Sequence, residues 1–189
     1  MSLTHSILLG SGSPRRKELL EAAGFDVRVH ATGADESWPT GEPSDAVKTL
    51  AVRKMRALGE SVPEPESAAV TADTVVFLDQ EPLNKPVDHD DAVRMLRSLN
   101  GRAHEVITAF CVRLGERERV AAVSTRVWFR RLRLIEIERY VASGEPMDKA
   151  GAYGIQGGGG ALVDRLEGSY TNVVGLPLAE LIETIEEMA

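Results

Sequence analysis

Residues 7–24 contain an apolar run that leads through a short turn into a helix, and this arrangement limits the possible folds most. Residues 7–9 are Ile-Leu-Leu and end at a glycine, which is typical of a buried strand. Ser13 is a favoured residue before a helix, and Pro14 suits the first helical position because its missing N–H costs nothing there. Gly24 is placed to end the helix. The pattern predicts strand, turn and helix.

The remaining pattern alternates helices and strands first and shows a hairpin later. Strands are expected over 25–29, 68–78, 105–114, 120–132 and 161–166, and helices over 45–58, 88–99, 134–142 and 178–188. Asp45 is a candidate cap for the first of these helices, and Asp88 or Asp90 for the second. The order predicts an α/β fold, a mixed twisted sheet with flanking helices. We expect one domain over 1–189, with two lobes at most.

The charge balance argues against a nucleic-acid partner. Acidic residues outnumber basic residues by 29 to 22, for a net charge of −7. Proteins that bind duplex nucleic acid usually carry the opposite balance, because they displace counterions from phosphates. Any phosphate is therefore expected in a local basic pocket.

Membrane and secretion signals are also missing from the pattern. No run approaches the about 18 apolar residues that a membrane span needs. Residues 1–9 lack a basic segment and a long apolar segment. The single cysteine, Cys111, lies in an apolar stretch and allows no intramolecular disulfide. We expect a cytoplasmic protein without a membrane partner.

The turn at residues 11–16, Ser-Gly-Ser-Pro-Arg-Arg, is the first candidate site. A helix N-terminus presents free N–H groups and partial positive charge. Arg15 and Arg16 are unfavourable there unless an anion lies between them, and arginine forks hold phosphate oxygens well. The alternative is a plain capped helix with exposed arginines.

Asp73, inside the valine- and threonine-rich stretch 68–78, is the second candidate. Strands disfavour aspartate, and a buried carboxylate is costly unless it is paired or binds a metal. Asp73 is therefore a candidate metal ligand or general base. The alternative is an aspartate at a solvent-facing strand end.

Three further segments are weaker candidates on their own. Lys85 precedes a proline that should direct it out of the sheet, although a solvated loop lysine explains it better. The acidic pair Asp35-Glu36 offers oxygen ligands to Mg²⁺, or is a solvated loop. In the stretch 149–160, six glycines allow close approach to a flat ligand, and Gln156 could read a base edge. The alternative there is a flexible loop.

Taken in order, these segments resemble the Maf family of nucleoside-triphosphate pyrophosphatases, over nearly the whole chain. The matching pieces are residues 11–16 with 18–20, Asp35-Glu36, Lys54, Asp73-Thr74-Val75-Val76, Lys85-Pro86, Gly101-Arg102 with His104, Gly144-Glu145, residues 149–157 and residues 172–177. The resemblance implies two lobes around a deep cleft, a fold shared with inosine-triphosphate pyrophosphatases, and often a homodimer.

The resemblance also implies an activity and a set of residues. The reaction would cut the α–β phosphoanhydride of a nucleoside triphosphate with a divalent metal, Mg²⁺ or Mn²⁺. Asp73 matches the family's proposed general base, and Glu36 and Asp73 are the implied metal-facing carboxylates. The implied substrate-binding residues are Ser11, Ser13, Arg15, Arg16, Lys54, Thr74, Lys85 and Gln156. Among them, Arg15, Thr74 and Gln156 match the positions linked to substrate choice.

The subgroup that prefers 7-methyl-GTP typically has Trp at the position of Arg15, Gln at that of Thr74 and no Tyr-Gly-Ile-Gln run. This sequence therefore looks like the dTTP/UTP subgroup, with modified pyrimidine nucleotides as further candidate substrates. The sequence departs from the family pattern at two positions, which are Gly10, where alanine is usual, and Asn84. The alternative function is a non-catalytic nucleotide-sensing protein that inhibits septum formation, as the family's history suggests.

Overall fold

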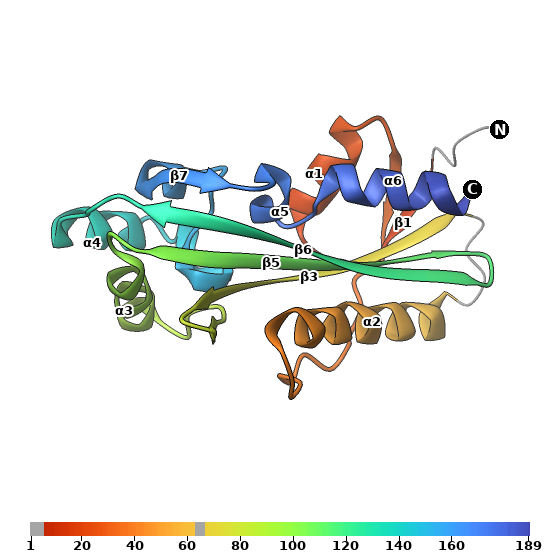
Figure 1. The fold of residues 1–189 in the computed structure, drawn as a ribbon, viewed down its shortest axis with the longest axis horizontal. Helices are drawn as coiled ribbons and strands as arrows, with labels where there is room; N and C mark the ends of the chain where they lie inside the picture. Colours follow the sequence, from red (N-terminus) through yellow and green to blue (C-terminus); the bar gives the residue numbers. More distant parts are fainter. Residues whose placement is uncertain (1–5, 63–66) are drawn as a thin grey trace. The chain divides into compact units, whose positions relative to one another are not determined.

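The computed structural model describes residues 6–62 and 67–189. The helices are α1 (Pro14–Ala22), α2 (Pro43–Ser61), α3 (His89–Leu99), α4 (Leu134–Ala142), α5 (Tyr170–Val174) and α6 (Leu178–Met188) (Figure 1). The strands are β1 (Ser6–Leu9), β2 (Asp26–Val29), β3 (Ala68–Leu78), β4 (Glu81–Leu83), β5 (Ala103–Leu114), β6 (Arg117–Phe129) and β7 (Val163–Glu167). Three short 3₁₀ helices, η1 (Glu145–Asp148), η2 (Ala150–Ala152) and η3 (Gly158–Leu162), occupy the glycine-rich stretch.

Within the described residues, the strands form one mixed sheet. Their order is β2-β1-β3-β5-β6-β7, and β4 pairs with β3. The strand β1 is parallel to both β2 and β3, whereas the β3–β4 and β6–β7 pairs are antiparallel. The predicted mixed α/β sheet with flanking helices is confirmed.

The chain divides into two compact units. Unit 1 comprises the described residues up to Asp73, then Thr108–Val123 and Gly175–Ala189, and unit 2 comprises Thr74–Ile107 and Ser124–Val174. Strands β3, β5 and β6 contribute residues to both units. That residues 1–189 act as one domain stays a prediction.

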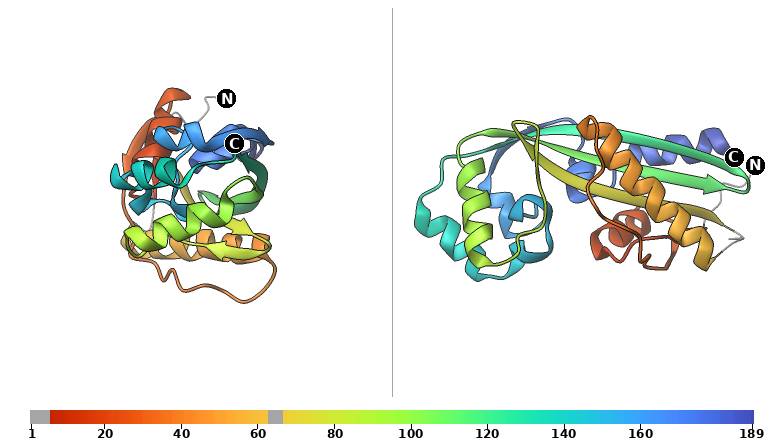
Figure 2. Two further views of the ribbon diagram at one scale, coloured as in Figure 1. Left: turned by 90° about the vertical axis from the view of Figure 1, so that its left-hand side faces the viewer. Right: turned by 90° about the horizontal axis from the view of Figure 1, so that it is seen from below.

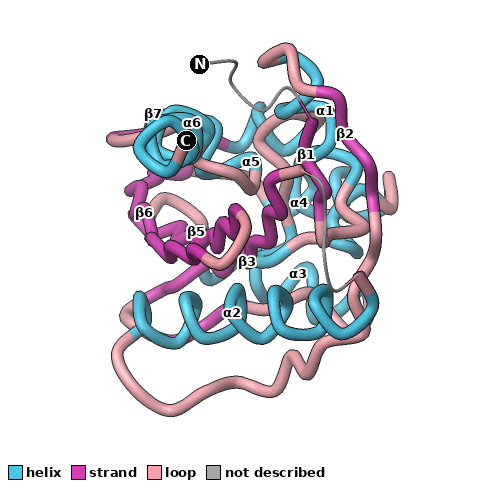
Figure 3. The backbone as a smooth tube through the Cα atoms, turned by 90° about the vertical axis from the view of Figure 1, so that its right-hand side faces the viewer, coloured by secondary structure: helices cyan, strands magenta, loops and turns pink. Residues whose placement is uncertain are grey.

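Unit 1 has helices on both faces of its strands. Figure 3 shows α2 on one face and α1 and α6 on the other. A buried apolar cluster joins β1, β3 and β5 to α1 and α6; its members include Ile7, Leu9, Leu20, Val70, Phe110, Leu181 and Ile185. Successive side chains of a strand point to opposite faces, so Val70 and Ala72 face this cluster while Thr71 faces α2. The Thr71 hydroxyl donates to the Ala51 carbonyl of α2 over 2.8 Å.

Close packing surrounds Gly10 at the end of β1. Its N–H donates to the Val70 carbonyl over 2.8 Å. A methyl group on its Cα would lie 2.6 Å from Cγ2 of Thr71 and 2.9 Å from Cδ2 of Leu58. The absence of a side chain at position 10 therefore lets β3 and α2 approach the strand.

Unit 2 has its own buried apolar cluster, with members from β3, β5, β6, α3, α4 and the glycine-rich stretch. Among them are Leu96, Leu99, Val127, Phe129, Ile137 and Tyr153. Helix α3 packs with α4 and with η1 and η2 (Figure 2, right). The hairpin between β3 and β4 turns at Asp79 and Gln80, whose φ angles are 52° and 70°, as suits a tight hairpin.

The predicted ends of two helices are confirmed, and the predicted cap of a third helix is wrong. Ser13 precedes α1 and Gly24 follows it with a φ of 91°, both as predicted, although the Ser13 side chain makes no capping hydrogen bond. Asp88 caps α3 by accepting from the N–H of Asp91 over 2.8 Å. The prediction that Asp45 caps α2 is wrong, because the helix begins two residues earlier with a proline at its first position.

Candidate functional site

The turn before α1 is held together by Arg16. This side chain is only 8% exposed. Its Nη1 donates to Oγ of Ser11 over 2.9 Å, and its Nε donates to the Gly175 carbonyl over 2.8 Å. The same Ser11 oxygen accepts the N–H of Ser13 over 3.3 Å. The alternative of exposed arginines is therefore wrong for Arg16, whereas Arg15 is half-buried.

Electrostatics tie this turn to two carboxylates of the same unit. Burial lowers the pKa of Arg16 below its ordinary value, and the positive charge of Arg15 acts in the same direction. The negative charges of Asp73 and Glu36 oppose this change. A buried guanidinium is costly unless negative charge compensates it, so Asp73 and Glu36 make the burial of Arg16 tolerable.

Lys54 lies between these two carboxylates. Its Nζ forms an ion pair with Glu36 at 2.9 Å and a second, shorter one with Asp73. Lys54 and Asp73 are well shielded, with side chains 12% and 14% exposed, whereas Glu36 is 63% exposed. Asp73 follows Thr71 on the strand face toward α2, which explains why it meets a lysine of that helix.

The loop that carries Glu36 is organised by its neighbours. Both carboxylate oxygens of Asp35 accept hydrogen bonds from Ser37, from its N–H over 2.9 Å and from its hydroxyl over 2.7 Å. These bonds lower the pKa of Asp35. Arg53 of α2 donates to the Ser37 carbonyl over 2.7 Å. Asp35 thus shapes the loop, while Glu36 meets Lys54.

The other three predicted residues lie in unit 2. Thr74 is partly buried on β3. Lys85 is exposed in the segment after β4, where the Asn84 carbonyl accepts the N–H of Gly151 over 3.2 Å. Gln156 is exposed in a turn closed by a 3.3 Å hydrogen bond from the N–H of Gly157 to the Gly154 carbonyl.

Comparison with known proteins assigns the chain to a family. Residues 6–188 match the family model described as "Maf-like protein". The chain belongs to the Maf family. A relative from Vibrio parahaemolyticus, named dTTP/UTP pyrophosphatase, is 46% identical over 188 residues, covering 99% of each chain. Relatives with the same name are 49% identical in Citrifermentans bemidjiense, covering 95% of this chain and 94% of that one, and 50% identical in Anaeromyxobacter dehalogenans, covering 92% and 89%.

The matching solved structures are more distant in sequence. A nucleoside-triphosphatase, dITP/XTP pyrophosphatase, from Mycobacterium abscessus is 16% identical, with a TM-score of 0.46 over 97% of this chain and 98% of that one. The Ham1 protein of Staphylococcus aureus is 12% identical, with a TM-score of 0.47 over 66% of this chain and 71% of that one.

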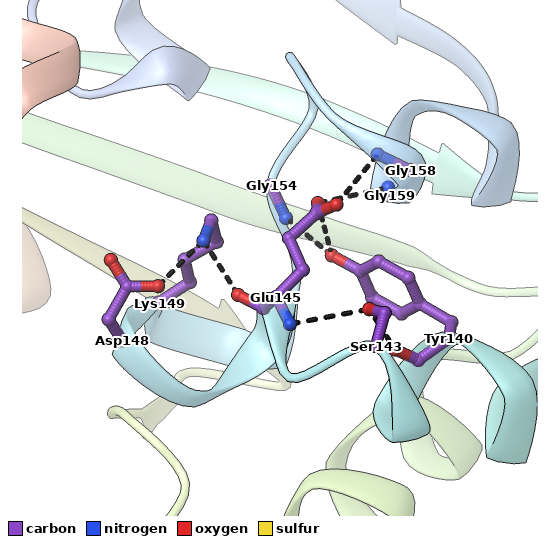
Figure 4. Close-up of polar contacts among 8 residues, drawn as sticks. All are labelled: Tyr140, Ser143, Glu145, Asp148, Lys149, Gly154, Gly158 and Gly159. Atoms are coloured by element: carbon purple, nitrogen blue, oxygen red, sulfur yellow. Dashed lines mark hydrogen bonds and ion pairs between the residues drawn. The ribbon is translucent and has the colours of Figure 1, made fainter.

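Sequence reasoning missed two features of this Maf protein. The first is the Gly175 carbonyl, which accepts from Arg16 although 159 positions separate them. The second is the contact of Tyr140 and Glu145 with the glycine-rich loop (Figure 4). Glu145 was part of the family resemblance, but nothing in its local sequence indicates its partner. Sequence reasoning assigned the close approach at these glycines to a ligand, and the structure has protein atoms there.

Two broader properties concern the described part of the chain only. Among residues 6–62 and 67–189, no three His, Cys, Asp or Glu side chains gather as a metal-binding group. Within the same ranges, no helix is both long and apolar enough to cross a membrane. Glu36 and Asp73 are two carboxylates that converge on one cation, the Lys54 ammonium.

Proposed function

We propose that this Maf protein hydrolyses dTTP and UTP, and modified pyrimidine nucleotides, to the monophosphate and pyrophosphate. The observation that carries the proposal is that Asp73 and Glu36 share Lys54, while the negative charges of both carboxylates also act on Arg16. The names of relatives that align over nearly the full chain support the choice of substrate.

The proposed reaction is an attack of water on the α-phosphorus. A bond forms between the water oxygen and this phosphorus, and the bond to the bridging oxygen of the β-phosphate breaks. Asp73 would take the proton of the water, as a positioned carboxylate does in general base catalysis. Pyrophosphate leaves with the electron pair of the broken bond.

The positive side chains would stabilise charge that builds up on phosphate oxygens. Arg15, Arg16 and Lys54 lie in the same compact unit as Asp73. Fixed cations in a shielded site stabilise such charge more strongly than they do in water. Arg16 is already oriented by its two hydrogen bonds, so little reorganisation would be needed. For Ser11 and Ser13 we propose contacts to phosphate.

We further propose a divalent cation, Mg²⁺ or Mn²⁺, held by Glu36 and Asp73. The two carboxylates fit such an ion, because both contact one positive group in the structure. Mg²⁺ commonly takes one or two carboxylates together with substrate phosphates and water. When bound, the ion would supply further positive charge to the phosphate oxygens.

For the residues of unit 2 we keep the roles predicted from the sequence. Lys85 is proposed to contact phosphate, and Thr74 and Gln156 to contribute, with Arg15, to the choice of nucleotide. The Gln156 amide offers both a donor and an acceptor, which suits a pyrimidine edge.

A panel of nucleotides tests the proposal directly. The purified protein is incubated with dTTP, UTP, modified pyrimidine triphosphates and purine triphosphates, with Mg²⁺ or Mn²⁺, and pyrophosphate is measured. We expect dTTP and UTP to be cleaved fastest, with turnover lost after chelation of the metal and restored by its return. No release from any nucleotide would refute the proposal and favour the nucleotide-sensing alternative.

Two properties of the working protein complete the proposal. We expect it to act as a homodimer, which sedimentation equilibrium would test. We also expect it to act in the cytoplasm on the free nucleotide pool, in keeping with its one buried cysteine.

A further inference from the structure

The Glu145 carboxylate is bound by the loop that carries Gln156. Figure 4 shows its side chain between Tyr140 and the glycines. Its Oε2 accepts the N–H of Gly158 over 2.8 Å, and its Oε1 accepts the Tyr140 hydroxyl over 2.8 Å and the N–H of Gly159 over 3.3 Å. Hydrogen bonds to an ionised acceptor are the stronger class, so three on one carboxylate make a firm attachment.

Tyr140 extends this attachment to the other side of Gln156. Its hydroxyl accepts the N–H of Gly154 over 3.1 Å while it donates to Glu145. The Tyr140 side chain is buried at the end of α4, and burial raises its pKa, so the hydroxyl keeps its proton for this bond. The loop is thus bound at Gly154, before Gln156, and at Gly158 and Gly159, after it.

Glu145 is itself held in place. The N–H of Glu145 donates to the Ser143 hydroxyl over 3.3 Å, and that hydroxyl donates to the Tyr140 carbonyl over 2.6 Å. Lys149 donates to the Glu145 carbonyl over 2.6 Å and also pairs with Asp148. The carboxylate therefore projects from a backbone that several bonds immobilise.

The glycines of the loop fit this arrangement. A methyl group at Gly157 would lie 2.6–2.7 Å from the Glu145 carboxylate atoms. At Gly159 it would lie 2.7 Å from the Tyr140 hydroxyl and 2.6 Å from the Gly154 carbonyl. A side chain at Gly157 would have to displace the Glu145 carboxylate, and one at Gly159 would collide with the Gly154 backbone. Glycine at both positions is therefore what allows the loop to reach Glu145 and Tyr140 in this geometry.

We propose that Glu145 and Tyr140 are positioning residues that hold the loop at residues 154–160 and thereby orient Gln156 for selection of the nucleotide base. The role in base selection rests on the proposed function. The attachment itself can be tested without any activity.

The main test uses two variants that break the attachment differently. Glu145→Gln puts an NH₂ group where an oxygen accepted a hydrogen bond, so one donor of the loop or Tyr140 loses its acceptor. Gly157→Ala keeps Glu145 but displaces its carboxylate. Glu138→Gln removes a charge from an exposed position of α4 and Gly33→Ala adds a methyl group in open space, so these two are the matched controls.

Two measurements are made on each variant. Amide hydrogen exchange of the loop should accelerate about tenfold or more in both test variants, the effect of losing one charge-assisted hydrogen bond, and stay unchanged in both controls. For the preferred pyrimidine triphosphate, KM should rise about tenfold while kcat changes far less, and the preference over purine triphosphates should shrink.

The outcomes separate the inference from the proposed function. Unchanged loop exchange in both test variants would overturn the attachment. Faster exchange with unchanged base preference would overturn its role in selection. If wild type releases no pyrophosphate from any nucleotide, the proposed function fails while exchange still decides whether the attachment exists. If Glu145→Gln does not fold, Gly157→Ala carries the test.

Discussion

Replacing Asp73 by asparagine separates binding from chemistry in the proposed reaction. Asparagine has nearly the shape of aspartate and keeps one oxygen that can accept from Lys54. Lys54 also retains its ion pair with Glu36 at 2.9 Å. The substitution therefore removes a charge and a basic oxygen while leaving the neighbouring side chains in place.

The expected sizes of the two effects differ widely. The Lys54 ammonium would donate to a neutral amide oxygen in place of a carboxylate, and Arg16 would lose part of the negative charge that compensates its burial. Relief from burying a carboxylate offsets part of these costs, so the free energy of unfolding should fall by about 1–2 kcal/mol. Loss of a general base lowers kcat by about 10²–10⁴-fold. That range corresponds to about 2.7–5.5 kcal/mol in the activation barrier.

Three measurements on Asp73→Asn check this reasoning: kcat from pyrophosphate release, Kd for dTTP in the absence of divalent metal, and urea unfolding. Removing a negative charge reduces repulsion of the phosphates, so Kd should stay the same or fall. A kcat above about a tenth of the wild-type value would show that Asp73 is not the general base. A large loss of stability would instead make its pairing with Lys54 a structural requirement.

Three other substitutions test separate features. Arg15→Lys should lower kcat/KM for dTTP and UTP because lysine lacks a planar fork, and near-wild-type kinetics would argue against bidentate contact. Arg16→Lys cannot reach both Ser11 and Gly175, so urea unfolding should reveal a loss of about 1.5–3 kcal/mol for each bond not replaced. His104 is buried, and burial lowers its pKa from 6.5 to about 4. As the pH falls below 6.5, His104 takes up a proton in the unfolded chain before it does so in the folded protein. The contribution of His104 to the free energy of unfolding is therefore complete above pH 6.5 and declines by about 3 kcal/mol as the pH falls to 4. Unfolding curves of His104→Gln should lack this pH-dependent part, and an identical pH dependence in both proteins would contradict the assignment.

Local patterns predicted most of the secondary structure. The start of α1 at Ser13 and Pro14, the strand Ala68–Leu78 and the helix Leu134–Ala142 depend on neighbours in sequence, which explains their agreement with the structure. Competing local signals caused the error at α2, where Asp45 was a plausible cap but Pro43 already begins the helix.

Contacts between distant segments were beyond such patterns. The sequence indicated that Asp73 needs a partner, because a carboxylate inside a strand is costly, yet it could not identify Lys54 as that partner. The burial of Arg16 depends on the Gly175 carbonyl, far along the chain. Likewise, glycines in the loop at 154–160 predicted a close approach, while only the fold reveals that Glu145 and Tyr140 are what they approach.

The packing at Gly10 has a consequence for how this chain can change over generations. An alanine there would collide with both Thr71 and Leu58, so it becomes acceptable only after both side chains have shortened or moved. The order of substitutions therefore matters: a neutral replacement in one genetic background would be harmful in another. Replacing Gly10 by alanine in this chain alone should reduce yield, and paired changes to smaller side chains at positions 58 and 71 should restore it.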